Sequence, residues 1–427
     1  MRQTVKRCRE KCGGASVNCG TLLGVNNVLA ESGTDLANAS ELATASTLPT
    51  NALDAYEAQE AAATRADHLS AATRERRVQI LCIAATFGAG LVSAVQSRVN
   101  GSFGAALGNS FLSALINFGS ALIILTIAML LSPQGRNGLN RVISSLKSGQ
   151  ARARNRFAEV PHPGVTGVGH LRWFQIIGGA AGGLFVTAQG MSVPVLGVAL
   201  FVVAVTAGQS VSSLFCDRLG IAPGGKRRIT LARAAGPLIT IAAVVISQWP
   251  NISARFSGET DLHLGFIALP IIAGIFVAAQ HAANGRIETT ATVVPKPNGD
   301  PARHHYGAGV LTATFINFLV GTIALAVVAS ISLAVQGYPA GNGPLAWWMF
   351  TGGLLGVIFI GTSAGVMHRI GALMVILSLV AGQTVGGLLL DLSPWGGSIV
   401  PPANTFIGVV LVLVAITIPA LQARKSR

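Results

Sequence analysis

Long apolar runs recur along the chain from Val78 to the C-terminus, separated by shorter polar segments. A helix of about 20 apolar residues spans the hydrocarbon core of a bilayer. Inside hydrocarbon every backbone N–H and C=O must be paired within its own segment, so each run predicts a helix rather than a strand. The pattern therefore predicts an all-α membrane protein with ten transmembrane helices. The predicted spans are 78–97, 107–132, 172–191, 193–215, 229–248, 263–283, 307–335, 346–366, 370–390 and 404–422.

Residues 1–77 have a different composition from the rest of the chain. They are rich in Ala, Ser, Thr, Asn and Glu, and the apolar stretch Thr21–Ala30 is short and interrupted by Asn26 and Asn27. A secretory signal needs a longer apolar run. A polar segment of this kind cannot bury enough apolar surface to fold alone, which predicts a disordered cytoplasmic extension. A start codon assigned too far upstream is the alternative interpretation.

Basic residues between the spans predict the orientation of the chain. In a ten-helix arrangement, 28 of the 30 Lys and Arg residues fall on one side of the membrane, and only Arg98 and Arg255 fall on the other. Lys and Arg accumulate in cytoplasmic connections. We therefore expect an integral protein of the plasma membrane, the inner membrane of a bacterium, with both termini in the cytoplasm.

The overall composition agrees with a membrane protein and excludes several other classes. Hydrophobic residues make up 51% of the chain and charged residues only 11%, against about one quarter in soluble proteins. The formal net charge of +14 arises in the short connections after residue 77, where topology explains it, so nucleic acid is not an expected partner. The five cysteines form no disulfide framework, and no cluster has metal-ligand spacing. We expect neither a metal nor a cofactor.

An internal repeat relates two halves of the membrane part. At a constant offset of 174 residues, 173–217 aligns without a gap with 347–391 and shares its Trp, Phe, Gln, Asp and several glycines. The repeats are predicted as 78–250 and 251–427. Each repeat contains five of the ten predicted spans. Because five is an odd number, the two halves are predicted to have opposite orientations in the membrane. Inverted repeats are typical of alternating-access transporters, which hold the substrate near the midplane where the halves meet.

Four motifs of this repeat resemble one known family. They are Gln-x-x-x-Asn-Gly at 96–101, Asn-Phe at 117–118, Gly-Gly-x-x-Gly at 178–182, and Gly-Gln at 208–209 followed eight residues later by Asp217. The pattern resembles the YdcZ-type integral membrane family of the drug/metabolite transporter superfamily, in its fused ten-helix form, across 78–427. The resemblance implies a small-molecule transporter of the exporter type and does not fix a substrate. Residues 1–77 and the loop 292–305 lie outside the pattern.

Eight amide side chains within or at the ends of the spans are the candidate substrate pathway. Polar groups in a span are costly unless they are paired or face an aqueous cavity, which makes them functional candidates. Residues four apart on a helix share a face, so two of these pairs present their amides together. Hydrogen bonding between helices is the alternative role. The candidates are Gln96, Asn100, Asn117, Gln209, Gln280, Asn284, Asn317 and Gln383.

Three ionisable residues are candidates for gating or coupling. Asp217 and Asp391 occupy equivalent ends of the fourth and ninth spans, where they could gate the cavity or simply be solvated. His281 lies in the sixth span, and an imidazole changes charge near neutral pH, so it could couple proton or ion movement to transport. Packing is the alternative for this histidine, whose counterpart is Ser97. No predicted span contains a central Glu.

Four repeated glycines are predicted to serve helix packing. Small residues four apart allow membrane helices to approach closely. Gly178 and Gly182 in the third span match Gly352 and Gly356 in the eighth.

The sequence as a whole predicts a secondary transporter that exports a small organic solute by alternating access between the two repeats. Few fixed charges line the candidate pathway, so a neutral, amphipathic or weakly charged substrate is favoured over a multivalent anion. A fused chain needs no partner subunit, which predicts a monomer that contacts only substrate and membrane lipid. A passive channel, a lipid scramblase and a non-transporting scaffold remain alternatives. Gly361-Thr-Ser363-Ala-Gly365 imitates a hydrolase motif but lies in an apolar helix, so an enzyme is not expected.

Overall fold

The computed structural model describes residues 50–154, 171–219, 231–256, 265–294, 303–396, 401 and 403–425. The first part contains α3 (Thr50–Leu107), α4 (Ser110–Leu131), α5 (Pro133–Arg154), α6 (Trp173–Ile176), α7 (Gly178–Leu219) and α8 (Leu231–Phe256). The second part contains α9 (Gly265–Thr292), β1 (Val293–Val294), β2 (Arg303–His304), α10 (Tyr306–Gln336), η2 (Trp347–Thr351), α11 (Gly352–Leu392), η3 (Pro394–Gly396) and α12 (Ala403–Lys425).

Each of the ten predicted spans coincides with a helical stretch. Seven helices in the described part of the chain are long and apolar enough to cross a membrane, and two shorter apolar helices, Pro237–Ser247 and Ala403–Ala415, account for the fifth and tenth spans. The stretch Trp173–Cys216 holds two spans, because the backbone of α7 is broken at Gly197. The predicted fold class, an all-helical membrane protein with ten helices, is therefore confirmed, apart from the short antiparallel pair of β1 and β2.

Several helix ends lie outside the predicted limits. α3 begins at Thr50, within the segment predicted to be disordered, whereas residues 1–49 lie outside the described residues. By its internal contacts the chain divides into two units, Met1–Glu75 and Arg76–Arg427. α5 forms in the predicted connection 133–172, and α9 continues to Thr292, nine residues past its predicted end. These segments are more polar than the spans, and length and hydropathy alone do not predict them.

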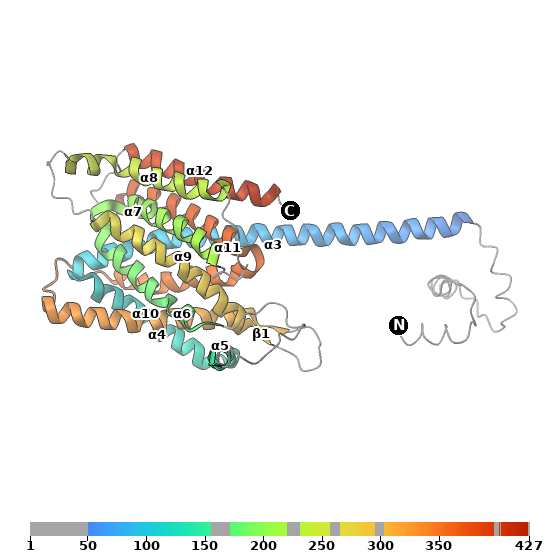
Figure 1. Cartoon of the computed structure of the whole chain (residues 1–427), viewed down its shortest axis with the longest axis horizontal. Helices are drawn as coiled ribbons and strands as arrows, with labels where there is room; N and C mark the ends of the chain where they lie inside the picture. The colour runs from blue at the N-terminus through green and yellow to red at the C-terminus, as the bar shows by residue number, and fades with distance from the viewer. Residues whose placement is uncertain are drawn as a thin grey trace. The chain divides into compact units, whose positions relative to one another are not determined.

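The helices pack side by side. In Figure 1, α8 lies beside α12 at one edge of the bundle and α10 lies beside α4 at another, with α7, α9 and α11 between them. Residues of both halves share one apolar core cluster, which contains Phe118 and its counterpart Phe318. The ring centroids of this pair are 4.7 Å apart. The two halves therefore contact each other through residues that are equivalent in the two repeats.

Contacts between the halves come in matching pairs. Gly179 lies against the backbone carbonyl of Asn317, and its counterpart Gly353 lies against the carbonyl of Asn117. Each contact joins one half to the other, with the roles of the halves exchanged. This reciprocity is the pattern that a twofold axis between equivalent halves produces. The opposite orientation of the two halves in the membrane stays a prediction.

The same reciprocity governs two close helix crossings. Where α7 crosses α9, Gly208 lies against the carbonyl of Ile271, and Gly274 lies against the carbonyl of Val205. At the equivalent crossing of α3 and α11, Gly90 and Gly382 make the matching contacts. At all four positions an added Cβ would collide with backbone, so only glycine permits these approaches.

Candidate functional site

A small cavity lies where the two halves meet. Its volume is about 20 Å³, which is room for roughly one water molecule. Most of its wall consists of counterpart pairs from the two repeats: Gln96 and Gln280, Phe118 and Phe318, Gly182 and Gly356, Phe185 and Phe359, Val186 and Ile360, with Val277 and Asn317. We call it the central cavity.

On one side of the central cavity, amides and hydroxyls of the first half form a hydrogen-bonded chain. Asn117 Nδ2 donates to Asn100 Oδ1 (2.8 Å), and Asn100 Nδ2 donates to Gln189 Oε1 (2.7 Å). Gln189 Nε2 then donates to Ser97 Oγ (2.8 Å). Gln383 of the second half donates through Nε2 to Ser93 Oγ (2.8 Å), and Ser97 Oγ donates to the carbonyl of Ser93. A hydrogen-bonded network of this kind restricts the orientations of its members.

The second half has a shorter amide cluster. Gln280 Nε2 donates to Asn317 Oδ1 at 2.7 Å, and Asn284 Nδ2 donates to the same oxygen at 3.3 Å. All three side chains are at most 2% exposed. The structure thus groups the two matching sets of candidate amides around the boundary between the halves.

Two buried acceptor atoms in this region lack a hydrogen-bond donor among the described residues. They are Gln96 Oε1 and Asn117 Oδ1. Gln96 itself lines the central cavity and donates through Nε2 to the carbonyl of Gly352 (3.1 Å). A buried acceptor without a donor costs about 1–3 kcal/mol. A ligand with an N–H or O–H group could remove this cost.

The repeated glycines make room for these amides. A Cβ on Gly182 would lie 2.7 Å from Gln280 Nε2, and a Cβ on Gly356 would lie 2.7 Å from Gln96 Nε2. Gly352 faces the amides of Asn100 and Asn117, whereas Gly178 has the looser contact, 3.3 Å from Ala283. The predicted packing role therefore takes a specific form, in which three of the four glycines pack against side-chain amides.

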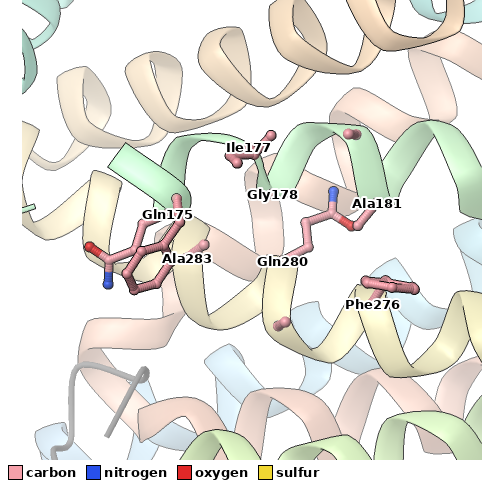
Figure 2. A pocket seen from close by; sticks show the side chains of 10 residues that line it. Gln175, Ile177, Gly178, Ala181, Phe276, Gln280 and Ala283 are labelled. Atoms are coloured by element: carbon pink, nitrogen blue, oxygen red, sulfur yellow. The ribbon is translucent and has the colours of Figure 1, made fainter. Parts of the chain in front are cut away.

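A larger cavity adjoins the central one. It has a volume of about 310 Å³ and lies between the start of α7 and the middle of α9, with Gln280 in the wall of both cavities. Figure 2 shows the Gln280 side chain reaching from α9 toward α7, with Phe276 and Ala283 on the same wall. The remaining lining is mostly apolar. This cavity is large enough for a small organic molecule.

Three further candidates lie away from the walls of the central cavity. Gln209 is buried at the crossing of α7 and α9, and its Oε1 lacks a donor among the described residues. Gln383 occupies the equivalent crossing and bonds to Ser93. His281 is 3% exposed and packs edge-on against Phe359, with ring centroids 5.5 Å apart. The imidazole thus lies just behind the wall that Phe359 contributes.

Asp391 has a definite structural contact, which joins the two halves. Gly197 has a φ of 78°, a conformation that favours glycine, and a second helical segment of α7 starts after it. Asp391 Oδ1 accepts the N–H of Val198 (2.9 Å), and Oδ2 accepts the N–H of Ala199 (2.7 Å). A carboxylate at a helix N-terminus satisfies unpaired N–H groups and the helix dipole. The side chain of Asp217, its counterpart, lies outside the described residues.

Asp391→Ala is expected to lower the unfolding free energy by about 1–3 kcal/mol, because two buried N–H groups lose their acceptor. Thermal unfolding in detergent measures the effect. Leu392→Ala, at the neighbouring exposed position, serves as the control and should melt near the wild-type temperature. Equal melting temperatures of the two variants would show that the Asp391 carboxylate does not stabilise the segment of α7 that starts after Gly197.

Sequence reasoning missed two polar residues of this region. Gln189 is completely buried and links Asn100 to Ser97, but its counterpart is Ser363, so a search restricted to repeated residues passes over it. Glu288 lies beyond residue 283, where the sixth span is predicted to end, yet it belongs to α9 and is 1% exposed. The signal for Glu288 was its four-residue spacing from Asn284, which continues the polar face of the helix.

Ten apolar helices around a polar site buried between two halves define an integral membrane protein of the transporter class. A family model described as "Putative inner membrane exporter, YdcZ" matches residues 81–147, 156–246 and 302–418. The chain belongs to this family of inner membrane proteins, and the predicted resemblance is confirmed.

Individual relatives agree with the family assignment. The chain is 27% identical over 161 residues to the inner membrane protein YdcZ of Escherichia coli (strain K12), an alignment that covers 38% of this chain and 95% of the relative. One relative therefore corresponds to less than half of this chain. A crystal structure of a protein aligns with 82% of this chain and 98% of its own length, at 16% identity and a TM-score of 0.43, and this likeness adds nothing to the assignment.

Proposed function

We propose that the chain is a secondary transporter that exports a small neutral aromatic solute carrying a hydrogen-bond donor. The observation that carries the proposal is the central cavity, whose wall is built from matching residues of both repeats. A site at the boundary between repeats can be exposed to either side of the membrane as one half moves against the other. The excess of basic residues in the connections on one side supports a cytoplasmic location for both termini.

The wall of the central cavity suggests the chemistry of the solute. Phe118, Phe318, Phe185 and Phe359 offer aromatic surfaces, and aromatic rings prefer tilted or offset contacts with one another. Gln96 Oε1 offers an acceptor that lacks a donor among the described residues. A neutral ring with an N–H or O–H group would satisfy both features. None of the described residues that line this wall carries a charge, which favours a neutral solute.

The closed state of the central cavity favours a transporter over an open channel. A volume of about 20 Å³ cannot hold an organic solute, so the halves must move apart before one enters. The neighbouring cavity of about 310 Å³ shares Gln280 with it and offers a place of approach. Because one chain supplies both halves, the proposal requires no second subunit.

Counterflow in proteoliposomes tests the proposal with a matched pair of solutes. Wild-type protein is expected to exchange labelled N-acetyltryptophanamide faster than its analogue methylated on the indole nitrogen, by roughly tenfold for the loss of one hydrogen bond. Protein-free liposomes give the background. Movement of neither solute above background would contradict the proposed substrate class, and movement of fluorescent phospholipid instead would favour the scramblase alternative.

A further inference from the structure

Polar side chains form a continuous row along one face of α9. Gln280, Asn284, Glu288 and Thr292 follow one another at intervals of four residues, and each is at most 2% exposed. Residues four apart lie one above the other on a helix. The row begins at the wall of the central cavity and ends where α9 meets α5 and α10. We call it the α9 polar row.

Glu288 is the one carboxylic acid in this row, and hydroxyl groups hold it in place. Thr292 Oγ1 donates to Glu288 Oε1 at 2.9 Å, and Thr289 Oγ1 lies 3.5 Å from Oε2. Gly309 of α10 packs so closely that a Cβ there would lie 3.2 Å from Glu288 Oε1. The carboxyl is therefore enclosed between two helices instead of facing bulk water.

A basic side chain of a neighbouring helix contacts this end of α9. Arg141 of α5 donates to the backbone carbonyl of Ala291, which ties α5 to the last turn of α9. Partial burial lowers the pKa of Arg141, but its ordinary value is so high that the guanidinium keeps its charge. Among the side chains that the structure describes, the other titratable or charged groups on the helices that contact α9 are Arg136 and Lys147 on α5, Arg172 before α6, Cys216 and Arg218 on α7, His281 and Arg286 on α9, His305 and Tyr306 at the start of α10, and Arg369 and Asp391 on α11.

The two repeats differ at this position. The residue equivalent to Glu288 in the first half is Gly104, which packs against Gly190 and Ser110. When equivalent halves exchange conformations, an acid present in only one of them changes its surroundings. The protonation of that acid then differs between the two states, and by linkage a proton gradient biases which state is populated.

We propose that Glu288 is a proton-binding site that couples solute movement to a proton gradient. A proton from water at the end of α9 near α5 binds a carboxylate oxygen and gives the neutral acid, and the same proton leaves when the alternate state connects Glu288 to the opposite side along the α9 polar row. No other bond forms or breaks. The proposal rests on the proposed transport function.

The first test measures coupling in proteoliposomes with Glu288→Gln, and Glu288→Asp is the matched variant that keeps a carboxyl. The probes are labelled N-acetyltryptophanamide and an internal pH dye. Glu288→Gln is expected to keep counterflow but to lose accumulation driven by a pH gradient, whereas Glu288→Asp retains both. Gradient-driven accumulation by Glu288→Gln at the wild-type level would overturn the proposal, and so would an equal loss of counterflow in a folded variant.

A second measurement needs no solute and separates this proposal from the transport function. Infrared spectra of the wild-type protein in liposomes are expected to show a protonated-carboxyl band that titrates with pH and shifts in Glu288→Asp. If the wild type moves no solute yet this band is present, the proposed function fails and the proton site stands. A band that is unchanged by Glu288→Asp would overturn the site.

Discussion

Gly274→Ala is expected to destabilise the folded protein by about 3 kcal/mol or more, at the upper end of the usual cost of overpacking, because the new methyl group meets backbone instead of a movable side chain. It would collide with the carbonyl of Val205 and lie 3.1 Å from the backbone nitrogen of Gln209. Neither helix can yield without moving the whole crossing of α7 and α9. The yield of monodisperse protein in detergent and its melting temperature measure the effect.

Gly88→Ala is the matched control for this prediction. Gly88 also lies inside a membrane-spanning helix, but nothing lies within 4 Å of a Cβ built there. Alanine stabilises a helix relative to glycine by about 0.5–1 kcal/mol, so this variant should melt at or slightly above the wild-type temperature. If both variants behave alike, the close crossing is not what holds α7 to α9.

Replacing both cavity glutamines, as Gln96→Leu with Gln280→Leu, is expected to reduce solute counterflow by about a hundredfold. Each substitution keeps the approximate size of the side chain and removes one amide, and one hydrogen bond to the solute accounts for about tenfold. Both side chains line the central cavity, and both also contact the opposite half or a neighbouring helix. Initial rates in proteoliposomes at equal protein content give the comparison.

The control for the glutamine pair is Gln175→Leu, which removes an amide from the wall of the larger cavity but not of the central one. Its flux should stay within about threefold of wild type, because the solute passes Gln175 without being held there. The melting temperatures of all variants must match before rates are compared. A double variant that retains full counterflow would show that the solute does not pass between the two glutamines.

The number of helices could be predicted because a segment that crosses the hydrocarbon core of the membrane has to pair its own backbone groups. An apolar run of sufficient length has few alternatives to a membrane helix, so the broken helix α7 is predicted as two spans, 172–191 and 193–215. The observed break at Gly197 falls a few residues inside the second of them. The end of α9 could not be predicted in the same way. Glu288 follows the apolar run, and its four-residue spacing from Asn284 is a weak signal by itself. The packing of α10 against Glu288 shows that the segment is a buried helix.

Candidate site residues could be predicted where the two repeats agree. Gln96 and Gln280 line the same cavity, as their matching positions suggested. Gln189 has no matching amide, so its place between Asn100 and Ser97 depends on tertiary contacts that no local pattern encodes. Asp391 was recognisable as a special residue from the repeat, but its role as a cap required knowledge of the broken backbone at Gly197.

Photoaffinity labelling tests most directly the claim that the solute binds between the two halves. Wild-type protein in liposomes is illuminated with a diazirine derivative of N-acetyltryptophanamide, and the labelled peptides are identified by mass spectrometry. The expected labels lie on Phe118, Phe318 and Gln280, and an excess of unlabelled solute should remove them. Labels confined to exposed apolar positions such as Ile123 and Ile323, and unaffected by competition, would contradict the account.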